Sequence, residues 1–306
     1  MFGYVDLGRA MTKKPSRAGK RIGPKSIVGG SIEIRMIESL LDQLGGAQTT
    51  AIEAAQEIIY DAWEAADRRK RVALAKKALA LSPLCADAYV LLAQETARDL
   101  DQEIDLYRQG VLAGEKALGK ACFREEVGHF WGLLETRPYM RARQGLAQKL
   151  WDKGSRDEAV AHFKDMLRLN PNDNQGIRYL LIDCLLLLGR DEEAADLTTT
   201  YKEDGSAAWI WSRALLAFRS SGDQTEAREM LSWAHNENRH VAPLLLGDKK
   251  MPRQLPAYIS CGSKDEAVAY VHGAAPAWSA TPGAIAWLRV CQSKHYRTQA
   301  RLQGRP

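Results

Sequence analysis

A glycine followed five residues later by an alanine recurs three times in this 306-residue chain, and each glycine has a large apolar residue four positions before it. The glycines are Gly154, Gly189 and Gly222, the alanines are Ala159, Ala194 and Ala227, and the apolar residues are Leu150, Leu185 and Phe218. Successive glycines are 35 and 33 residues apart. Self-similarity at such a period is typical of repeat architectures, so we expect stacked copies of one small unit.

Each unit is typical of two helices joined by a tight turn. Apolar residues precede the glycine at helical spacing, as in Leu146 and Leu150. The glycine permits a positive φ at the turn, and the alanine leaves room where the helices cross. In the best-matching unit, 140–173, Phe163 is also in register and Pro171 ends the second helix. No useful β-strand alternation appears, so we predict an all-α fold, a right-handed tetratricopeptide-like α-solenoid.

The repeat pattern extends beyond these three units. Upstream, residues 51–82 and 84–118 each suggest another helix pair, whereas 119–138 breaks the period and is interpreted as an insertion with its own short helix. The predicted organisation is a disordered basic tail at 1–30, a leading helix and linker at 31–48, repeats at 49–235, a helical C-terminal cap at 236–290 and a basic tail at 291–306.

The formal charge of +5 is concentrated at the two ends of the chain. Residues 1–30 carry seven bases and one acid, and residues 289–306 carry five bases and no acid, whereas residues 31–288 carry 31 bases and 37 acids. Basic tails are able to contact phosphates, which keeps a nucleic-acid-associated role open. The simpler interpretation is a pair of solubilising ends, with Met11 as an alternative start.

Several function classes find no support in the sequence. The longest apolar run, 179–188, is half of the roughly 20 residues that a membrane span needs. Five cysteines without a CxxC motif suggest a reducing compartment, and we expect a cytoplasmic protein. The stretch GEKALGKA at 114–121 lacks the hydroxyl of a phosphate-binding loop. We therefore expect no catalytic residue, no metal and no cofactor.

Separated stretches of the chain resemble the suppressor of tumorigenicity 7 family, a tetratricopeptide-like group. They are CADAYVLLAQE at 85–95, HVAPLLL at 240–246 and KDEAVAYV at 264–271, with Trp278 and GAIAWL following. The resemblance covers roughly 50–290 and suggests a short, soluble bacterial-type member. It departs from the family in lacking the membrane-spanning portion and in having Leu244 where a tyrosine is expected. It implies a scaffold or interaction role.

The first helix of each stacked pair is expected to line a concave groove. The predicted partner-binding residues on that groove are Arg141, Gln144, Gln148, Trp151, Tyr179, Asp183, Ser212 and Arg219. Arg, Tyr and Trp dominate binding hot spots, so we expect a noncatalytic adaptor that binds a protein segment there. The alternative for these residues is a solvated face with one or two buried members, and the alternative function is nucleic-acid binding by the tails.

Overall fold

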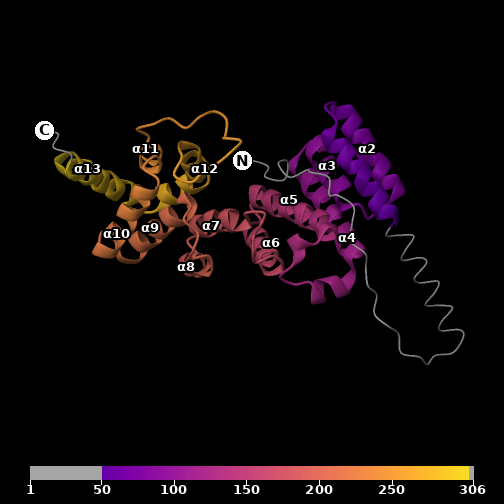
Figure 1. Cartoon of the computed structure of the whole chain (residues 1–306), viewed down its shortest axis with the longest axis horizontal. Coiled ribbons are helices and arrows are strands. Elements are labelled where there is room, and N and C mark those ends of the chain that lie inside the picture. The colour runs from indigo at the N-terminus through magenta and orange to yellow at the C-terminus, as the bar shows by residue number, and fades with distance from the viewer. Residues whose placement is uncertain (1–49, 303–306) are drawn as a thin grey trace, which may run out of the picture. The chain divides into compact units, whose positions relative to one another are not determined.

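The computed structural model describes the backbone of residues 50–302 and the side chains of residues 50–293. The chain divides into two compact units at residue 174. We call the described residues 50–174 the N-terminal unit and 175–302 the C-terminal unit. All regular elements within these ranges are helices, so the fold is all-α, as predicted (Figure 1). The tail and leading helix predicted for 1–30 and 31–48 lie outside the described residues.

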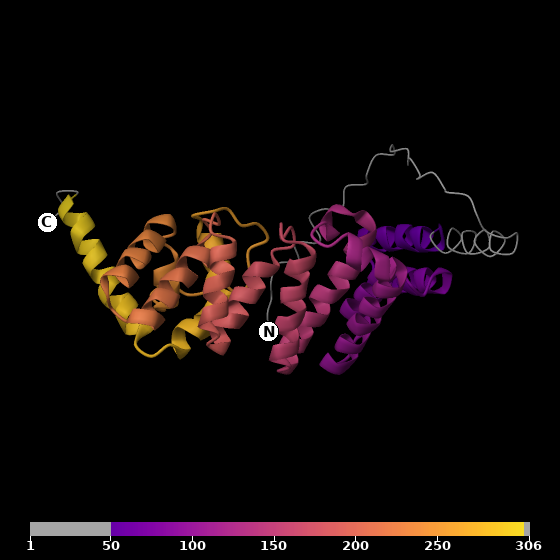
Figure 2. The same ribbon diagram turned by 90° about the horizontal axis from the view of Figure 1, so that it is seen from below.

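The N-terminal unit contains three helix pairs. Its elements are a helix over 50–64, α2 (Arg68–Leu81), α3 (Ala86–Thr96), α4 (Leu100–Glu125), the short 3-10 helices η2 (Phe130–Gly132) and η3 (Leu134–Thr136), α5 (Arg137–Lys153) and α6 (Arg156–Leu169). Within this unit α3 packs on α2, α4 and α5, and α5 packs on α6. Figure 2 shows these helices lying side by side.

The turn between α5 and α6 is formed by Gly154. Gly154 adopts a left-handed conformation with φ 93°, which glycine tolerates without a steric penalty. Its amide donates to the carbonyl of Trp151 at 3.0 Å, and the next amide, of Ser155, donates to Leu150 at 2.9 Å. Beyond the turn Ala159 is fully buried, which allows α6 to lie close to α5. Gly and Ala thus occupy the two places where a larger side chain would disturb the pair.

Most other side chains assigned to the repeat core are buried. These are Leu146, Leu150, Phe163, Leu185, Ala194 and Ala227. Phe218 is only partly buried, and it stacks on Trp287 with 4.4 Å between ring centroids. Pro171 is exposed and follows the end of α6 at Leu169. The turns at Gly189 and Gly222 also have positive φ, of 68° and 69°.

The C-terminal unit contains two further helix pairs and three additional helices. Its elements are α7 (Ile177–Leu188), α8 (Asp191–Thr200), α9 (Ala207–Ser221), α10 (Thr225–Glu237), α11 (Val241–Leu245), α12 (Lys264–Ala280) and α13 (Ala284–Leu302). The helix α12 packs along α7 and α9, the first helices of the two pairs. The helix α12 therefore covers the first helices of both pairs, and the predicted tail 291–306 is helical as far as Leu302.

The segment 119–138 differs from the separate short helix that its sequence suggests. Instead α4 continues through a kink at Gly119, and η2 and η3 follow. The ring of Phe130 is buried, with 5.2 Å between its centroid and that of Phe123 and 6.1 Å to that of Tyr139. These aromatic contacts hold the irregular segment against α4 and α5.

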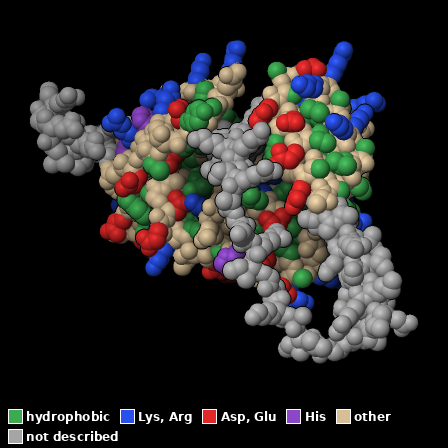
Figure 3. Space-filling view, turned by 45° about the vertical axis from the view of Figure 1, so that its right-hand side comes forward, with side chains coloured by type: hydrophobic (Ala, Val, Ile, Leu, Met, Phe, Trp, Pro, Cys, Tyr) green, Lys and Arg blue, Asp and Glu red, His purple; other side chains and the backbone are tan. Residues whose placement is uncertain are grey.

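The surfaces of the described residues are mixed in character. Blue, red and green side chains are interspersed on the visible face in Figure 3. Among the described helices, none combines the length and apolar character that crossing a bilayer requires.

Candidate functional site

A buried ion pair organises the predicted groove face of the N-terminal unit. Asp87 on α3 is fully buried, and its carboxylate receives two hydrogen bonds from Arg141 on α5, one of them from Nε to Oδ1 at 2.8 Å. Gln56 Nε2, from the helix over 50–64, donates to Oδ2 of the same carboxylate at 2.8 Å. The pair therefore joins the first helices of three successive pairs. Such a fully hydrogen-bonded pair offsets much of the cost of burying its charges.

Two aromatic side chains of the helix over 50–64 border this ion pair. The Arg141 guanidinium lies over the Trp63 ring, 5.2 Å from its centroid. The Tyr60 and Trp63 rings are 5.9 Å apart, and both side chains are partly exposed. Burial raises the pKa of Tyr60, although the nearby Arg141 opposes that rise. Arg141 itself keeps 22% of its side-chain surface exposed.

The same side of α5 continues with two amide side chains. Gln144 and Gln148 are three and seven residues after Arg141, which places all three on one face of the helix. Both glutamines are partly exposed. Trp151 is buried, and the guanidinium of Arg156 lies 5.3 Å from its centroid. We call Tyr60, Trp63, Arg141, Gln144 and Gln148 the Arg141 face.

The opposite side of α5 is used for packing against α6. Arg143 donates from Nε to Nδ1 of His162 at 3.1 Å and from Nη1 to the Tyr139 hydroxyl at 2.6 Å, and it pairs with Asp165. Burial and the charge of Arg143 lower the pKa of His162. These contacts place Arg143 at the interface between α5 and α6, and they leave the Arg141 face on the other side of α5.

In the C-terminal unit the corresponding side chains are covered by α12. Asp183 on α7 and Ser212 on α9 are buried, contrary to an open groove. Gly273 of α12 lies so close to Asp183 that a Cβ atom there would fall 2.0 Å from Oδ2. Because α12 occupies this face, neither side chain is available to a partner.

Arg219 is likewise bound within the C-terminal unit. It donates to Thr281 Oγ1 at 2.8 Å, to the Leu186 carbonyl at 2.9 Å and to the Ala277 carbonyl at 3.3 Å. It also forms an ion pair of 2.6 Å with Asp191, and only 11% of its side chain is exposed. Arg219 therefore anchors the end of α12 to α7 and α8, where the sequence places it on an open groove.

Tyr179 belongs to a separate cluster beside α7. Its hydroxyl donates to Asp204 at 2.8 Å, and Arg178 pairs with the same carboxylate at 2.8 Å. The Arg178 guanidinium lies 4.4, 5.3 and 5.9 Å from the ring centroids of Tyr179, Tyr201 and Trp209. Burial, assisted by the bond to Asp204, raises the pKa of Tyr179 to about 12. This cluster ties the loop before α9 to the start of α7.

The structure thus divides the eight predicted groove residues into groups. Arg141, Gln144, Gln148 and Trp151 lie together on α5, and Asp183, Ser212 and Arg219 lie beneath α12. Tyr179 lies in the separate cluster with Arg178 and Asp204. Sequence reasoning missed Gln56, Tyr60, Trp63 and Asp87. The first three recur at intervals of four and three along one helix, a spacing that indicates a shared face.

The thiol of Cys85, next to this site, is buried. Burial raises the pKa of Cys85 to about 12, so its thiol stays protonated at neutral pH and is a weak nucleophile. Within the described residues, no three His, Cys, Asp or Glu side chains are grouped as a metal site would require. The arrangement is suited to contact with another molecule through aromatic, amide and guanidinium groups.

Comparison with known proteins gives the family of the chain. Residues 45–302 match the family described as ST7 protein. The Protein ST7 homolog of Caenorhabditis elegans is 27% identical over 279 residues, which cover 78% of this chain and 50% of that protein. The human suppressor of tumorigenicity 7 protein-like is 26% identical over 259 residues, covering 78% of this chain and 45% of that protein.

The chain spans about half the length of these curated relatives. Among solved structures, the crystal structure of YrrB, described as a TPR protein with an unusual peptide-binding site, matches with a TM-score of 0.43 and 21% identity. That match covers 62% of this chain and 91% of YrrB. Because the ST7 match spans most of the sequence, the chain belongs to the ST7 protein family.

Proposed function

We propose that this chain is a noncatalytic adaptor that binds a segment of a partner protein on the Arg141 face. The observation that carries the proposal is the buried Asp87–Arg141 pair, which holds a partly exposed arginine over Trp63 and next to Tyr60. Arg, Tyr and Trp are the residues that most often dominate binding energy at protein interfaces.

The rigidity of the Arg141 face supports the same proposal. Arg141 is fixed by Asp87 and Trp63, and Asp87 is fixed in turn by Gln56. A side chain that is already ordered loses little further conformational entropy when a partner binds. Gln144 and Gln148 extend the face with groups that both donate and accept hydrogen bonds, as an extended peptide backbone requires.

The proposal is narrower than the groove that the sequence suggests. It keeps Arg141, Gln144 and Gln148, with Trp151 as a buried support, and it adds Tyr60 and Trp63. It leaves out Asp183, Ser212 and Arg219, because α12 occupies their face. It also leaves out Tyr179, because its hydroxyl is bound to Asp204. A nucleic-acid role for the basic ends remains the alternative, and residues 1–30 lie outside the described residues.

Site-specific photo-cross-linking tests the proposal. A photoreactive phenylalanine analogue at Gln144 should capture a partner in the native host, whereas the same analogue at Lys116, an exposed residue of α4 in the same unit, should not. Tyr60→Ala should weaken the isolated complex by about tenfold or more. Equal capture at both positions, or unchanged affinity in Tyr60→Ala, would move the binding site elsewhere.

A further inference from the structure

The N-terminal unit has an open groove that the Arg141 face does not include. It lies between α2 and the segment that joins α3 to α4, and its volume is about 560 Å³. Four exposed cations line it: Arg68, Arg69 and Lys76 from α2 and Arg98 from the connecting segment. Its apolar lining is Val72, Ala73 and Ala97.

The groove has a regular pattern along α2. Arg69 and Lys76 are seven residues apart, with Val72 and Ala73 three and four residues after Arg69. These intervals place the cation, the apolar pair and the second cation on one helix face. Seven residues correspond to about 10 Å along the helix axis. The groove therefore offers two positive charges about 10 Å apart with an apolar surface between them.

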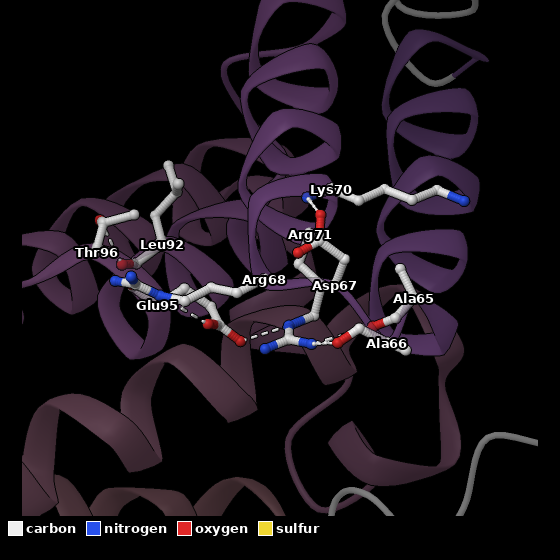
Figure 4. A network of polar contacts seen from close by, with 9 residues as sticks. All are labelled: Ala65, Ala66, Asp67, Arg68, Lys70, Arg71, Leu92, Glu95 and Thr96. Carbon is white, nitrogen blue, oxygen red and sulfur yellow. Dashed lines mark hydrogen bonds and ion pairs between the residues drawn. The ribbon is translucent and has the colours of Figure 1, made fainter.

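A neighbouring network fixes the helices that form the groove. Figure 4 shows Arg68 and Arg71 of α2 both reaching Glu95 at the end of α3. Arg71 Nε lies 2.6 Å from Glu95 Oε1, and its Nη1 donates to the Ala65 and Ala66 carbonyls at 3.1 and 2.9 Å. This clamp joins α2, α3 and the end of the helix over 50–64.

Of the cations that line the groove, Arg68 shares Glu95 with Arg71, and the other three are not neutralised in this way. Among the described residues, no acidic side chain lines the groove, and Glu95 is already shared by two arginines. The described residues contain no ion pair made by Arg69, Lys76 or Arg98. The first turn of α2 contains no acid, and its N-cap residue Asp67 accepts a hydrogen bond from the Lys70 amide.

We propose that this groove binds an acidic, amphipathic peptide segment of a partner protein. Carboxylates of the segment pair with Arg69, Lys76 and Arg98, and apolar side chains between them contact Val72, Ala73 and Ala97. The apolar lining favours a peptide over a nucleic acid, because no aromatic side chain in the part of the chain that the structure describes lines the groove for bases to stack on. The site is separate from the Arg141 face, so each is testable without the other.

Fluorescence anisotropy with a synthetic peptide tests the proposal on the full chain. The probe is a labelled helical peptide of about 14 residues with glutamates seven apart and leucines between them, and its control has glutamine in place of glutamate. We expect the glutamate peptide to bind at least about tenfold more tightly, and added salt to weaken it. No binding of the glutamate peptide, or equal binding of both peptides, would overturn the proposal.

Matched charge variants locate the binding. The variant Arg69→Glu, Lys76→Glu, Arg98→Glu should reduce peptide affinity by at least about tenfold. The control Lys77→Glu, Lys116→Glu, Lys120→Glu changes the same total charge at exposed residues outside the groove and should stay within about twofold. If the first variant does not fold, Lys76→Ala with Arg98→Ala should still weaken binding several-fold. Similar losses in groove and control variants, or tighter binding of single-stranded DNA than of the peptide, would overturn the proposal.

Discussion

The two units use the first helices of their repeats in opposite ways. In the N-terminal unit the groove side of α5 keeps Arg141, Gln144 and Gln148 partly exposed. In the C-terminal unit the equivalent side of α7 and α9 is covered by α12, and Asp183 and Ser212 are buried. One repeat pattern thus produces an open face in one unit and a filled face in the other.

The arginines on these first helices have different roles in the two units. Arg141 pairs with a buried carboxylate and still exposes part of its side chain. Arg219 instead binds residues of α7, α8 and α12, together with Thr281 at the C-terminal end of α12, and is almost fully enclosed. The helix α12 approaches closely because Gly273, Ala274 and Ala277 are small and buried. Substitutions in the two units should therefore have different effects: those in the N-terminal unit test the ion pair that supports the open face, and those in the C-terminal unit test the packing of α12 over the filled face.

The largest effect is expected for Arg141→Ala. This change leaves Asp87 buried without its cation and should lower the free energy of unfolding by about 3–5 kcal/mol. Chemical denaturation of the full chain measures the loss. The matched double variant Asp87→Asn, Arg141→Ala removes both charges and should recover part of it. A loss below about 1 kcal/mol in the single variant would mean that the pair does not organise the face.

A smaller loss of stability is expected for a substitution in α12, the helix that covers the C-terminal unit. A methyl group at Gly273 would press on the Asp183 carboxylate, so Gly273→Ala should destabilise the chain by about 1–3 kcal/mol. Gly205→Ala is the control, because Gly205 has no atoms within 4 Å of its added Cβ. Thermal denaturation followed by circular dichroism compares the two. Equal melting temperatures would contradict the close packing of α12 on α7.

The sequence predicted the helix pairs well because their signals are local. Gly154 and Ala159 are five residues apart, and both act through the geometry of a single turn and a single crossing. Such features repeat with the unit and remain recognisable without knowledge of the rest of the fold. The irregular segment 119–138 was predicted less well, because its path depends on aromatic contacts with side chains of α4 and α5 and not on a local sequence signal.

The site could not be predicted to the same extent, because its contacts join distant residues. Asp87 and Arg141 are 54 positions apart, and each alone is an ordinary charged residue on an amphipathic helix. The covering position of α12 has no periodic signal either. Its small residues indicate close packing against something, but only the folded C-terminal unit identifies α7 and α9 as that surface.

Tyr179→Phe removes one hydrogen bond to Asp204 and should lower the free energy of unfolding by about 1 kcal/mol. Burial disfavours the ionised carboxylate, but hydrogen bonds from Ser206, Tyr179 and Arg178 outweigh it and lower the pKa of Asp204 below its usual 3.8. A carboxylate with a lowered folded pKa stabilises the protein above pH 3.8 and loses that contribution as the pH falls through the folded value.

The pH dependence distinguishes this interpretation from a simple packing change. Tyr179→Phe should shift the pKa of Asp204 upward and so reduce the acid-sensitive part of the stability, while the difference from wild type narrows at low pH. Denaturant midpoints at neutral pH and at about pH 3 measure both quantities. A constant difference at the two pH values would show that the hydroxyl does not act through Asp204.

The smallest effect on stability is expected for the paired change Gln144→Ala, Gln148→Ala. Both side chains are partly exposed on the open face, so the free energy of unfolding should change by less than about 0.5 kcal/mol. Asp183→Ala, at a buried residue beneath α12, should cost more stability than the glutamine pair. The partner captured through position 144 should bind the glutamine variant more weakly and Asp183→Ala normally, provided the latter remains folded. The reverse result would place the interaction on the C-terminal unit and require α12 to move away from α7.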